Sequence, residues 1–261
     1  MSDPFRPVLP ISTPTIDVMV NHRSVRSYTK TPVPDADIQA ILTAAISAPT
    51  SSNQNLWSVI EVRDPERKTT LMELTGSNPF IAQAPVFLVF VADYSRLARL
   101  SERSQRPAEA LRYQEALLTA TVDAALAAQN ATVAAESLGY GTCYVGGIRS
   151  HIQEVCDLLD LPQFTYPVVG LVIGEPKDPG EAGIKPRLPL AGVHFRERYD
   201  KEDADAAVEA LELENLRYFT EIYGKTSSWK AKMLRRIEAA SSLGTRAGNR
   251  EVLAKRGFLD Q

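Results

Sequence analysis

Apolar residues recur along the chain at two spacings, one typical of helices and one typical of strands. Spacings of three and four predict helices over 15–21, from Asp35 as N-cap to just before Pro49, from Asp64 to about Gly76, and around 152–159. Alternating or continuous apolar runs predict strands over 57–62, 86–91, 142–145 and 168–173. The run 86–91 is apolar at every position, which is typical of a central strand buried on both faces.

The longest predicted helix covers 109–138 and ends at Gly139, which suits a C-cap. From Leu117 onward it is rich in alanine and apolar on most sides. We therefore expect it in the core or at a subunit interface, where small side chains let another helix approach closely. After Tyr199 the pattern changes to polar amphipathic helices over 203–223 and 228–240.

Together these elements predict an α+β chain with three or four strands. The simplest division has an irregular arm over 1–14, one domain over 15–199, and a helical extension over 200–261. The extension is expected to pack on the domain or on a dimer partner.

Composition and charge narrow the function classes. The chain has 261 residues and a net charge of −3, which gives no overall attraction to nucleic acid or to an anionic membrane. Its longest apolar stretch, 84–92, is far shorter than the roughly 20 residues of a membrane helix. The N-terminus lacks the pattern of a secretory signal. Cys143 and Cys156 lie in apolar surroundings, so buried free thiols in a reducing cytoplasm are expected.

The run 22–26, His-Arg-Ser-Val-Arg, is the first segment that suits a ligand. Guanidinium and hydroxyl donors match phosphate oxygens. In an extended chain Ser24 and Arg26 point the same way, so both can face one ligand. The simpler interpretation is a solvated basic turn.

Three further segments carry polar or flexible residues. The loop 48–55 offers many short donors and acceptors. The glycine-rich stretch 139–147 lets backbone amides approach a planar ligand, and Pro186 stiffens the cationic segment 185–187. Each also fits an ordinary loop or turn. The three histidines lack metal spacing, so no metal site is expected, and no GxSxG motif is present.

In combination and in this order, the segments resemble the FMN-dependent nitroreductase family, in particular its larger, NADPH-preferring group of oxygen-insensitive nitroreductases and flavin reductases. The resemblance extends from about Thr15 to Tyr199. Its most specific marks are 22–26, 123–139, 144–149 and 185–189. It implies a nitroreductase-like fold with a central mixed sheet flanked by helices, in an intertwined homodimer with FMN at the subunit interface.

The resemblance also implies roles for particular residues. The FMN phosphate would be held by His22, Arg23, Ser24 and Arg187. The pyrimidine side of the flavin would lie near Arg26 and Lys185, and the ring would lie along Tyr144, Val145, Gly146 and Gly147. The flavin held mainly by one chain would be contacted by the other chain's Ser51, Ser52 and Asn55. The flavin is the reactive group, so no catalytic side chain is expected.

Two positions depart from the family pattern. Asn78 stands where relatives commonly carry a glutamine near the flavin, one methylene longer. Relatives also have an arginine-rich loop that grips the NADPH 2′-phosphate. In the comparable segment 220–229 the one cation is Lys225, and Glu221 would repel a phosphate. NADPH and NADH therefore both stay open as electron donors.

The resemblance implies an oxidoreductase with two steps. NAD(P)H gives a hydride to FMN and leaves, and a nitroaromatic, quinone or similar planar acceptor then takes two electrons in the same pocket. Cations beside N1 and O2 would stabilise the reduced flavin. Two alternatives stay open: a flavin reductase that supplies reduced flavin to a partner monooxygenase, and an FMN-binding protein without useful turnover.

Overall fold

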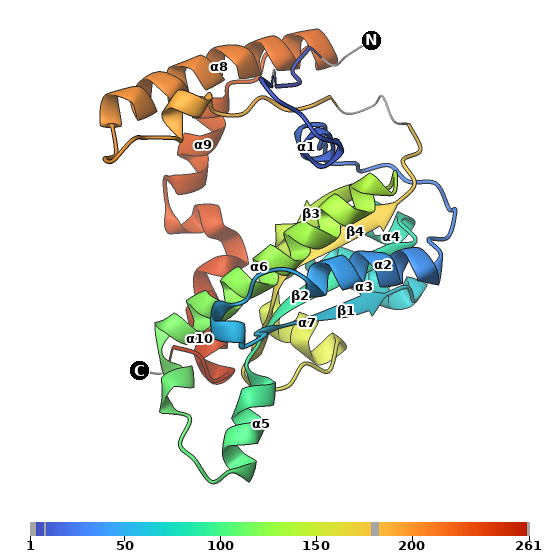
Figure 1. The fold of residues 1–261 in the computed structure, drawn as a ribbon, viewed down its shortest axis with the longest axis vertical. Coiled ribbons are helices and arrows are strands. Elements are labelled where there is room, and N and C mark those ends of the chain that lie inside the picture. Colours follow the sequence, from blue (N-terminus) through green and yellow to red (C-terminus); the bar gives the residue numbers. More distant parts are fainter. Residues whose placement is uncertain (1–3, 8, 179–182, 260–261) are drawn as a thin grey trace. The chain divides into compact units, whose positions relative to one another are not determined.

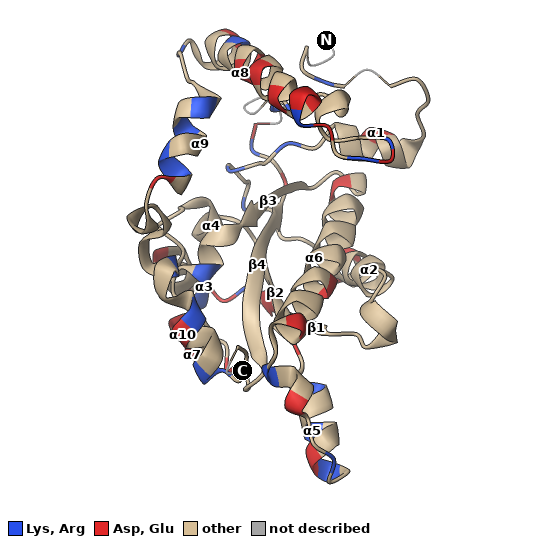
Figure 2. Ribbon diagram, turned by 90° about the vertical axis from the view of Figure 1, so that its left-hand side faces the viewer, with Lys and Arg blue, Asp and Glu red and all other residues tan. Residues whose placement is uncertain are grey.

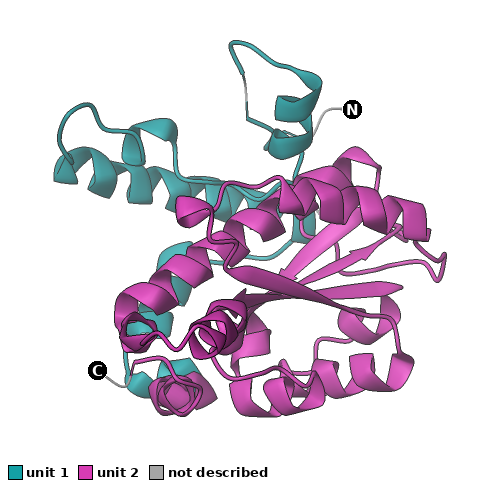
Figure 3. Cartoon of the chain, turned by 60° about the horizontal axis from the view of Figure 1, so that its bottom comes forward, with its two compact units in different colours: residues 1–23, 180–244 teal, residues 24–179, 245–261 magenta. Residues whose placement is uncertain are grey.

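The computed structural model describes residues 4–7, 9–178 and 183–259, and Figure 1 shows its helices and strands. The chain forms two compact units, coloured in Figure 3. The helical unit comprises 1–23 and 180–244, and the sheet unit comprises 24–179 and 245–261. Residues 245–261, which the sequence placed in the helical extension, thus belong to the sheet unit. Residues 1–3 and 8 of the predicted arm lie outside the described residues.

The sheet unit contains the four predicted strands. They are β1 (Trp57–Val62), β2 (Val86–Asp93), β3 (Gly141–Val145) and β4 (Thr165–Gly174), in the order β1-β2-β4-β3. Every pairing among them is antiparallel. The parallel component of the predicted mixed sheet is the single bridge between Ser24 and Thr142. β2 is buried along its whole length, as its continuous apolar run predicted.

Helices cover both faces of this sheet. The helices of this unit are α2 (Asp35–Ile46), α3 (Pro65–Leu74), α4 (Phe80–Gln83), α5 (Ser95–Arg103), α6 (Gln114–Ser137), α7 (Ile152–Leu158) and α10 (Asn249–Lys255). Of these, α5 projects beyond the sheet in Figures 1 and 2. Side chains of β2 alternate between the faces. Leu88 and Phe90 pack in a cluster with α2 and α6, while Phe87 and Val89 pack in a second cluster with α3, α4 and α7.

The long helix α6 begins later than predicted. Residues Glu109–Arg112 form a separate 3₁₀ turn, and Tyr113 is extended, with φ −86° and ψ 153°. The predicted C-terminal signal is confirmed. Gly139 has φ +88° and its N–H donates to the Glu136 carbonyl, while the next amide, of Tyr140, donates to Ala135. This is the Schellman arrangement, which requires a left-handed residue and therefore favours glycine.

The predicted N-cap of α2 is wrong. Pro34 occupies the cap position, no side chain caps the helix, and Asp35 is the first helical residue. Asp35 still favours the helix, because a carboxylate in the first turn interacts well with the helix dipole. It also pairs with Arg63 at 2.9 Å. The helices α4, α5 and α10 were not predicted.

The end of the chain is held in the sheet unit by buried groups. Phe258 is fully buried and stacks edge-on against Tyr166, with ring centroids 5.9 Å apart. Arg256 is also buried, and its guanidinium donates to the carbonyl oxygens of Leu161, Pro162 and Thr165. These contacts hold residues 256–258 against the start of β4.

The helical unit contains α1 (Pro14–Val20), α8 (Lys201–Tyr223) and α9 (Trp229–Ile237). Tyr218 of α8 is fully buried, stacks edge-on against Phe5, and donates a hydrogen bond of 3.2 Å to the Gly183 carbonyl. None of the described helices is long and apolar enough to cross a membrane. Both cysteines, which belong to the sheet unit, are free and buried, as predicted.

Candidate functional site

The segment 24–26 runs along the edge strand β3. Ser24 bridges Thr142, and the Val25 amide donates to the Thr142 carbonyl at 2.9 Å. Val25 is buried in the core, whereas Ser24 is half-buried and Arg26 is exposed. Because side chains alternate in an extended chain, Ser24 and Arg26 lie on the same side, away from the core. The Arg26 guanidinium donates to the Ser24 carbonyl at 3.2 Å.

Tyr144, near the end of β3, has a fixed hydroxyl. It accepts a hydrogen bond of 2.9 Å from Thr132 and donates one of 3.3 Å to Gln129, both on α6. Burial raises the pKa of Tyr144 to about 12, although the hydrogen bond from Thr132 acts in the opposite direction. The hydroxyl is therefore neutral at physiological pH and can both donate and accept.

The two glycines after β3 have different surroundings. A Cβ on Gly147 would lie 2.2 Å from the Thr75 carbonyl oxygen, so this glycine is required by the chain's own packing. The same oxygen accepts a hydrogen bond of 3.2 Å from Asn78, which brings Asn78 beside the end of β3. A Cβ on Gly146 would meet only the end of the Arg149 side chain, at 3.5 Å. Gly146 therefore leaves space that a planar ligand can use.

Arg149 places a positive charge beside these glycines. Its guanidinium donates to the Val168 carbonyl, and its backbone carbonyl accepts from Asn249 at 3.1 Å. Burial lowers the pKa of Arg149, and the nearby charge of Arg246 lowers it further. The half-buried cation Arg149 thus lies beside the end of β3. The sequence analysis assigned no role to this residue, although it belongs to the stretch 144–149 that resembles the family.

The loop 50–56, here called the serine loop, carries Ser51, Ser52 and Asn55. The loop begins with the 3₁₀ turn Ser51–Asn53 and is unusual because Ser52, Asn53 and Asn55 all have positive φ, at 47°, 57° and 57°. Left-handed backbone is disfavoured for residues with a Cβ, least so for asparagine.

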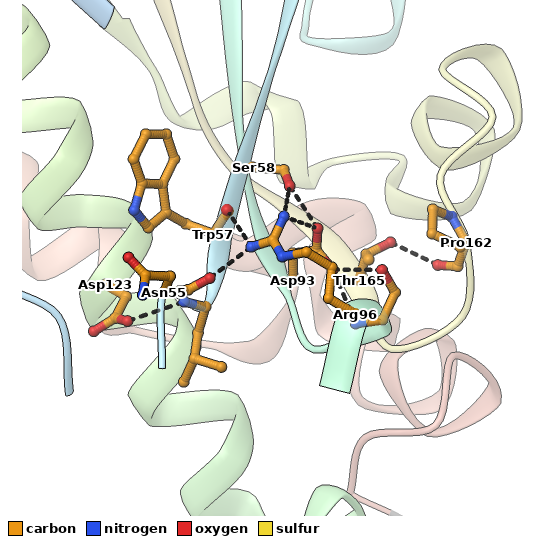
Figure 4. Close-up of polar contacts among 10 residues, drawn as sticks. Asn55, Trp57, Ser58, Asp93, Arg96, Asp123, Pro162 and Thr165 are labelled. Atoms are coloured by element: carbon orange, nitrogen blue, oxygen red, sulfur yellow. Dashed lines mark hydrogen bonds and ion pairs between the residues drawn. The ribbon is translucent and has the colours of Figure 1, made fainter. Parts of the chain in front are cut away.

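Two charged residues hold the serine loop from different sides, as Figure 4 shows. Asp123 of α6 accepts from the Thr50 hydroxyl and from the amides of Ser51 and Leu56. Arg96 of α5 donates to the Asn55 carbonyl at 2.5 Å. It also donates to Trp57 and Ser58 at the start of β1 and to Asp93 at the end of β2.

The serine loop and β3 lie at opposite edges of the sheet. The loop leads into β1, and the strand order places β1 three strand spacings from β3, roughly 14 Å. Among the described residues, no hydrogen bond joins the loop to Ser24 or to β3. Within one chain, the predicted flavin contacts of the sheet unit therefore form two separate groups.

The remaining predicted residues belong to the helical unit. His22 and Arg23 follow α1 and are half-buried, while Lys185 and Arg187 are exposed. The Arg187 guanidinium donates to the Lys185 carbonyl at 2.9 Å. Lys225 is exposed and follows Gly224, whose left-handed backbone (φ +59°) ends α8.

Further cations follow Lys225 on α9, where Figure 2 shows Lys and Arg in blue. Lys230 pairs with Glu209, and the Lys232 ammonium lies 4.2 Å from the centre of the Phe219 ring. The exposed pair Arg235 and Arg236 lies in the last turn of the helix. Lys225 is therefore one of several cations in this stretch of the helical unit.

Comparison with known proteins decides the family. Residues 19–175 match the nitroreductase family, and residues 185–261 match the C-terminal domain of the nitroreductase family. The chain belongs to the nitroreductase family. Family membership thus covers both the sheet unit and most of the helical unit.

Members of the nitroreductase family resemble this chain over most of its length. The FMN reductase (NAD(P)H) of Bacillus subtilis is 38% identical over 247 residues, covering 93% of this chain and 97% of the relative. The oxygen-insensitive NADPH nitroreductase of Salmonella typhimurium is 41% identical over 191 residues, covering 73% of this chain and 77% of the relative.

Solved structures agree with this assignment. The hypothetical oxidoreductase YcnD from Bacillus subtilis aligns with a TM-score of 0.90 at 36% identity, over 95% of this chain and 98% of that chain. The NADPH:FMN oxidoreductase from Vibrio harveyi, complexed with NAD+, aligns with a TM-score of 0.83 at 28% identity, over 95% and 100%. The predicted nitroreductase-like fold is confirmed.

Proposed function

We propose that this protein is an FMN-dependent NAD(P)H oxidoreductase that reduces nitroaromatics, quinones or similar planar acceptors. One observation carries the proposal: in a nitroreductase fold, the hydroxyl and guanidinium of Ser24 and Arg26 lie along β3, which ends at the open glycine Gly146. The names of the relatives, an FMN reductase and an NADPH nitroreductase, support the same activity.

The residues fit FMN in their chemistry. The phosphate requires cationic and hydroxyl donors, which His22, Arg23, Ser24 and Arg187 would supply. The ring would lie along Tyr144, Val145, Gly146 and Gly147, with Ser51, Ser52, Asn55 and Asn78 as further contacts. When bound, FMN accepts a hydride from NAD(P)H and passes two electrons to the acceptor.

The chain's own contribution is binding and charge stabilisation. The cations Arg26 and Lys185 would lie beside the pyrimidine edge, where reduction adds negative charge, so they favour the reduced state. Hydride transfer at N5 requires no protein acid or base, only a stacked nicotinamide in the right orientation. The cations after α8, beginning with Lys225, would attract the 2′-phosphate of NADPH, while NADH stays a possible donor.

We expect the active form to be a homodimer. Leu118, Val122 and Leu126 recur every four residues on α6 and are 50%, 55% and 39% exposed, which leaves an apolar helix face for a second copy. The separation of the serine loop from β3 also favours a site to which two chains contribute. Two buried free thiols suit the reducing cytoplasm, where we expect the protein to act.

A flavin reductase that feeds a partner monooxygenase is the second candidate, because one relative is named an FMN reductase. The two activities share the first half-reaction and differ in the acceptor. Steady-state rates with free FMN, compared with rates on a nitroaromatic or a quinone, would separate them.

Anaerobic reduction tests the proposal directly. The purified protein should bind oxidised FMN, and NADPH or NADH should bleach the flavin absorbance. A protein that takes up no FMN would refute the assignment, and bound flavin that neither nucleotide bleaches would favour a non-catalytic FMN-binding protein.

Arg26→Ala tests the proposed contact between Arg26 and the flavin. It should weaken FMN binding by about 10- to 100-fold, the range expected for a lost hydrogen bond to a charged group, and slow flavin reduction. Arg99→Ala, at an exposed arginine of α5 in the same unit, is the matched control and should leave both unchanged. Equal flavin content and reduction rate in the two variants would contradict the role of Arg26.

A further inference from the structure

We propose that Asp123 is a positioning residue for the flavin site: it holds the serine loop in the conformation that presents Ser51, Ser52 and Asn55 to FMN. The proposal rests on the proposed function, because it assumes that this loop contacts flavin. Asp123 itself reaches only the loop, through the Thr50 side chain and backbone amides.

The burial of Asp123 makes the contact obligatory. The residue is 1% exposed and stands among the alanines of α6. A buried carboxylate is strongly disfavoured unless hydrogen bonds or a cation satisfy it. Within the described part of the chain Asp123 forms no ion pair, so its charge is satisfied by the Thr50 hydroxyl and the amides of Ser51 and Leu56, at 2.5, 3.0 and 3.2 Å.

The loop needs this support because its backbone is strained. Ser52, Asn53 and Asn55 all adopt left-handed backbone, which costs free energy for residues with a Cβ and persists only where the surroundings determine it. Asp123 binds the loop both before and after these three residues, at Ser51 and at Leu56. Its carboxylate therefore closes the loop.

Thr50 extends the same support to Asn55. Its hydroxyl donates to Asp123 and accepts from the Asn55 amide at 2.8 Å. The Asn55 side chain then donates to the Asn53 carbonyl at 2.8 Å. Asp123 thus holds both ends of the loop, directly or through Thr50, while Arg96 holds the Asn55 carbonyl, so the flavin would meet polar groups that are already in place.

Pre-organisation of this kind acts on affinity. If the loop relaxes, the flavin must order it on binding. The measured affinity is then the intrinsic affinity multiplied by the fraction of molecules in the competent conformation. Asp123→Asn keeps the shape but replaces one acceptor oxygen by an NH2 that faces donors. Thr50→Val keeps the volume but removes the hydroxyl, so it disconnects Asn55 from Asp123.

The test measures FMN dissociation constants of the flavin-free proteins by fluorescence quenching, below the temperature at which each begins to unfold. Asp123→Asn and Thr50→Val should each weaken FMN binding about tenfold or more, while Thr50→Ser, which keeps the hydroxyl, should bind like the wild type. The matched control is Thr121→Val. Thr121 lies on α6 two residues before Asp123, and its hydroxyl contacts Leu117 and Tyr166, not the loop.

The positioning role is supported if Thr50→Val binds FMN more weakly while Thr50→Ser binds it like the wild type. Thr121→Val should also bind FMN like the wild type, although it loses a similar amount of melting temperature. This pattern does not depend on whether Asp123→Asn folds. Wild-type affinity in Thr50→Val, or equal losses in Thr50→Val and Thr121→Val, overturns the role of Asp123 and leaves the proposed function intact. A wild-type protein that binds no FMN overturns both.

Discussion

Replacing the two glycines after β3 separates what the chain itself requires from what is left open to a ligand. A Cβ on Gly147 would lie 2.2 Å from the Thr75 carbonyl oxygen, far inside van der Waals contact. A Cβ on Gly146 meets only the end of the flexible Arg149 side chain, at 3.5 Å, an ordinary contact. Gly147→Ala and Gly146→Ala are therefore a matched pair in one 3₁₀ turn.

The expected magnitudes follow from these distances. The Thr75 oxygen is backbone at the end of α3, so it moves only if α3 or the turn moves, and overpacking of this kind typically costs about 1–3 kcal/mol. Asn78, which donates to the same oxygen, would move with it. Gly146→Ala adds no clash and restricts the unfolded chain, so its stability should be unchanged or up to about 1 kcal/mol higher.

Urea unfolding and FMN titration of both flavin-free variants give the two readouts. Gly147→Ala should unfold at lower urea and melt several degrees lower, at about 2–4 °C per kcal/mol for a chain of this size. Gly146→Ala should be fully stable yet bind FMN more weakly, because its added methyl enters the space assigned to the ring. Equal stability of the two variants would refute the packing argument. Unchanged FMN affinity in Gly146→Ala would refute the placement of the ring.

Val122→Lys puts a charge on the exposed apolar face of α6 and should convert the proposed homodimer to monomers, which light scattering would detect as a halved mass. A dimer of unchanged mass would contradict that interface. Lys225→Ala should raise the Michaelis constant for NADPH more than that for NADH, unlike Lys201→Ala at another exposed lysine of the helical unit; equal effects on both nucleotides would exclude a contact with the 2′-phosphate. Burial raises the pKa of Tyr144 from 10.0 to about 12, so its stabilisation is complete below pH 10 and is lost as the pH rises toward 12. Tyr144→Phe should therefore flatten the fall in unfolding free energy over that range, and an unchanged slope would exclude the tyrosine as its cause.

The sheet was predictable because its pattern is set locally. β2 is apolar at seven consecutive positions and buried on both faces. Gly139 ends α6 by a backbone rule that depends on neighbouring residues alone. The start of α6 was not predictable in this way. The apolar spacing continues through Tyr113, and its extended backbone is decided by tertiary packing, in which the preceding Leu111 is buried.

The sequence allowed the residues of the candidate site to be named, but not the residue that holds the serine loop in place. Ser51, Ser52 and Asn55 could be named from a family resemblance, whereas the residue that shapes their loop lies 67 to 73 positions away from its partners. No spacing rule connects such distant positions. The usable signal was Asp123 itself, a carboxylate in the alanine-rich middle of a helix predicted to be buried, because a buried charge must find partners elsewhere in the fold.

The sign of a buried charge also predicts which backbone groups it hydrogen-bonds: a carboxylate accepts from amides, and a guanidinium donates to carbonyls. The carboxylate of Asp123 accepts hydrogen bonds from loop amides before β1. The buried guanidinium of Arg256 donates to the carbonyl oxygens of Leu161 and Pro162 before β4 and of Thr165 at its first position; Figure 4 includes Pro162 and Thr165. Irregular loops are where backbone groups lack partners in helices and strands, so buried charges and shaped loops occur together.

The proposed dimer face and the proposed support of the serine loop are adjacent on α6. Val122, on the apolar face offered to a second copy, directly precedes Asp123, which supports the serine loop. A change that separates the subunits therefore acts one residue from the carboxylate that orders the flavin contacts. If both proposals hold, Val122→Lys should lower FMN affinity together with dimer formation, because the loop of each chain would lose the flavin held by the other.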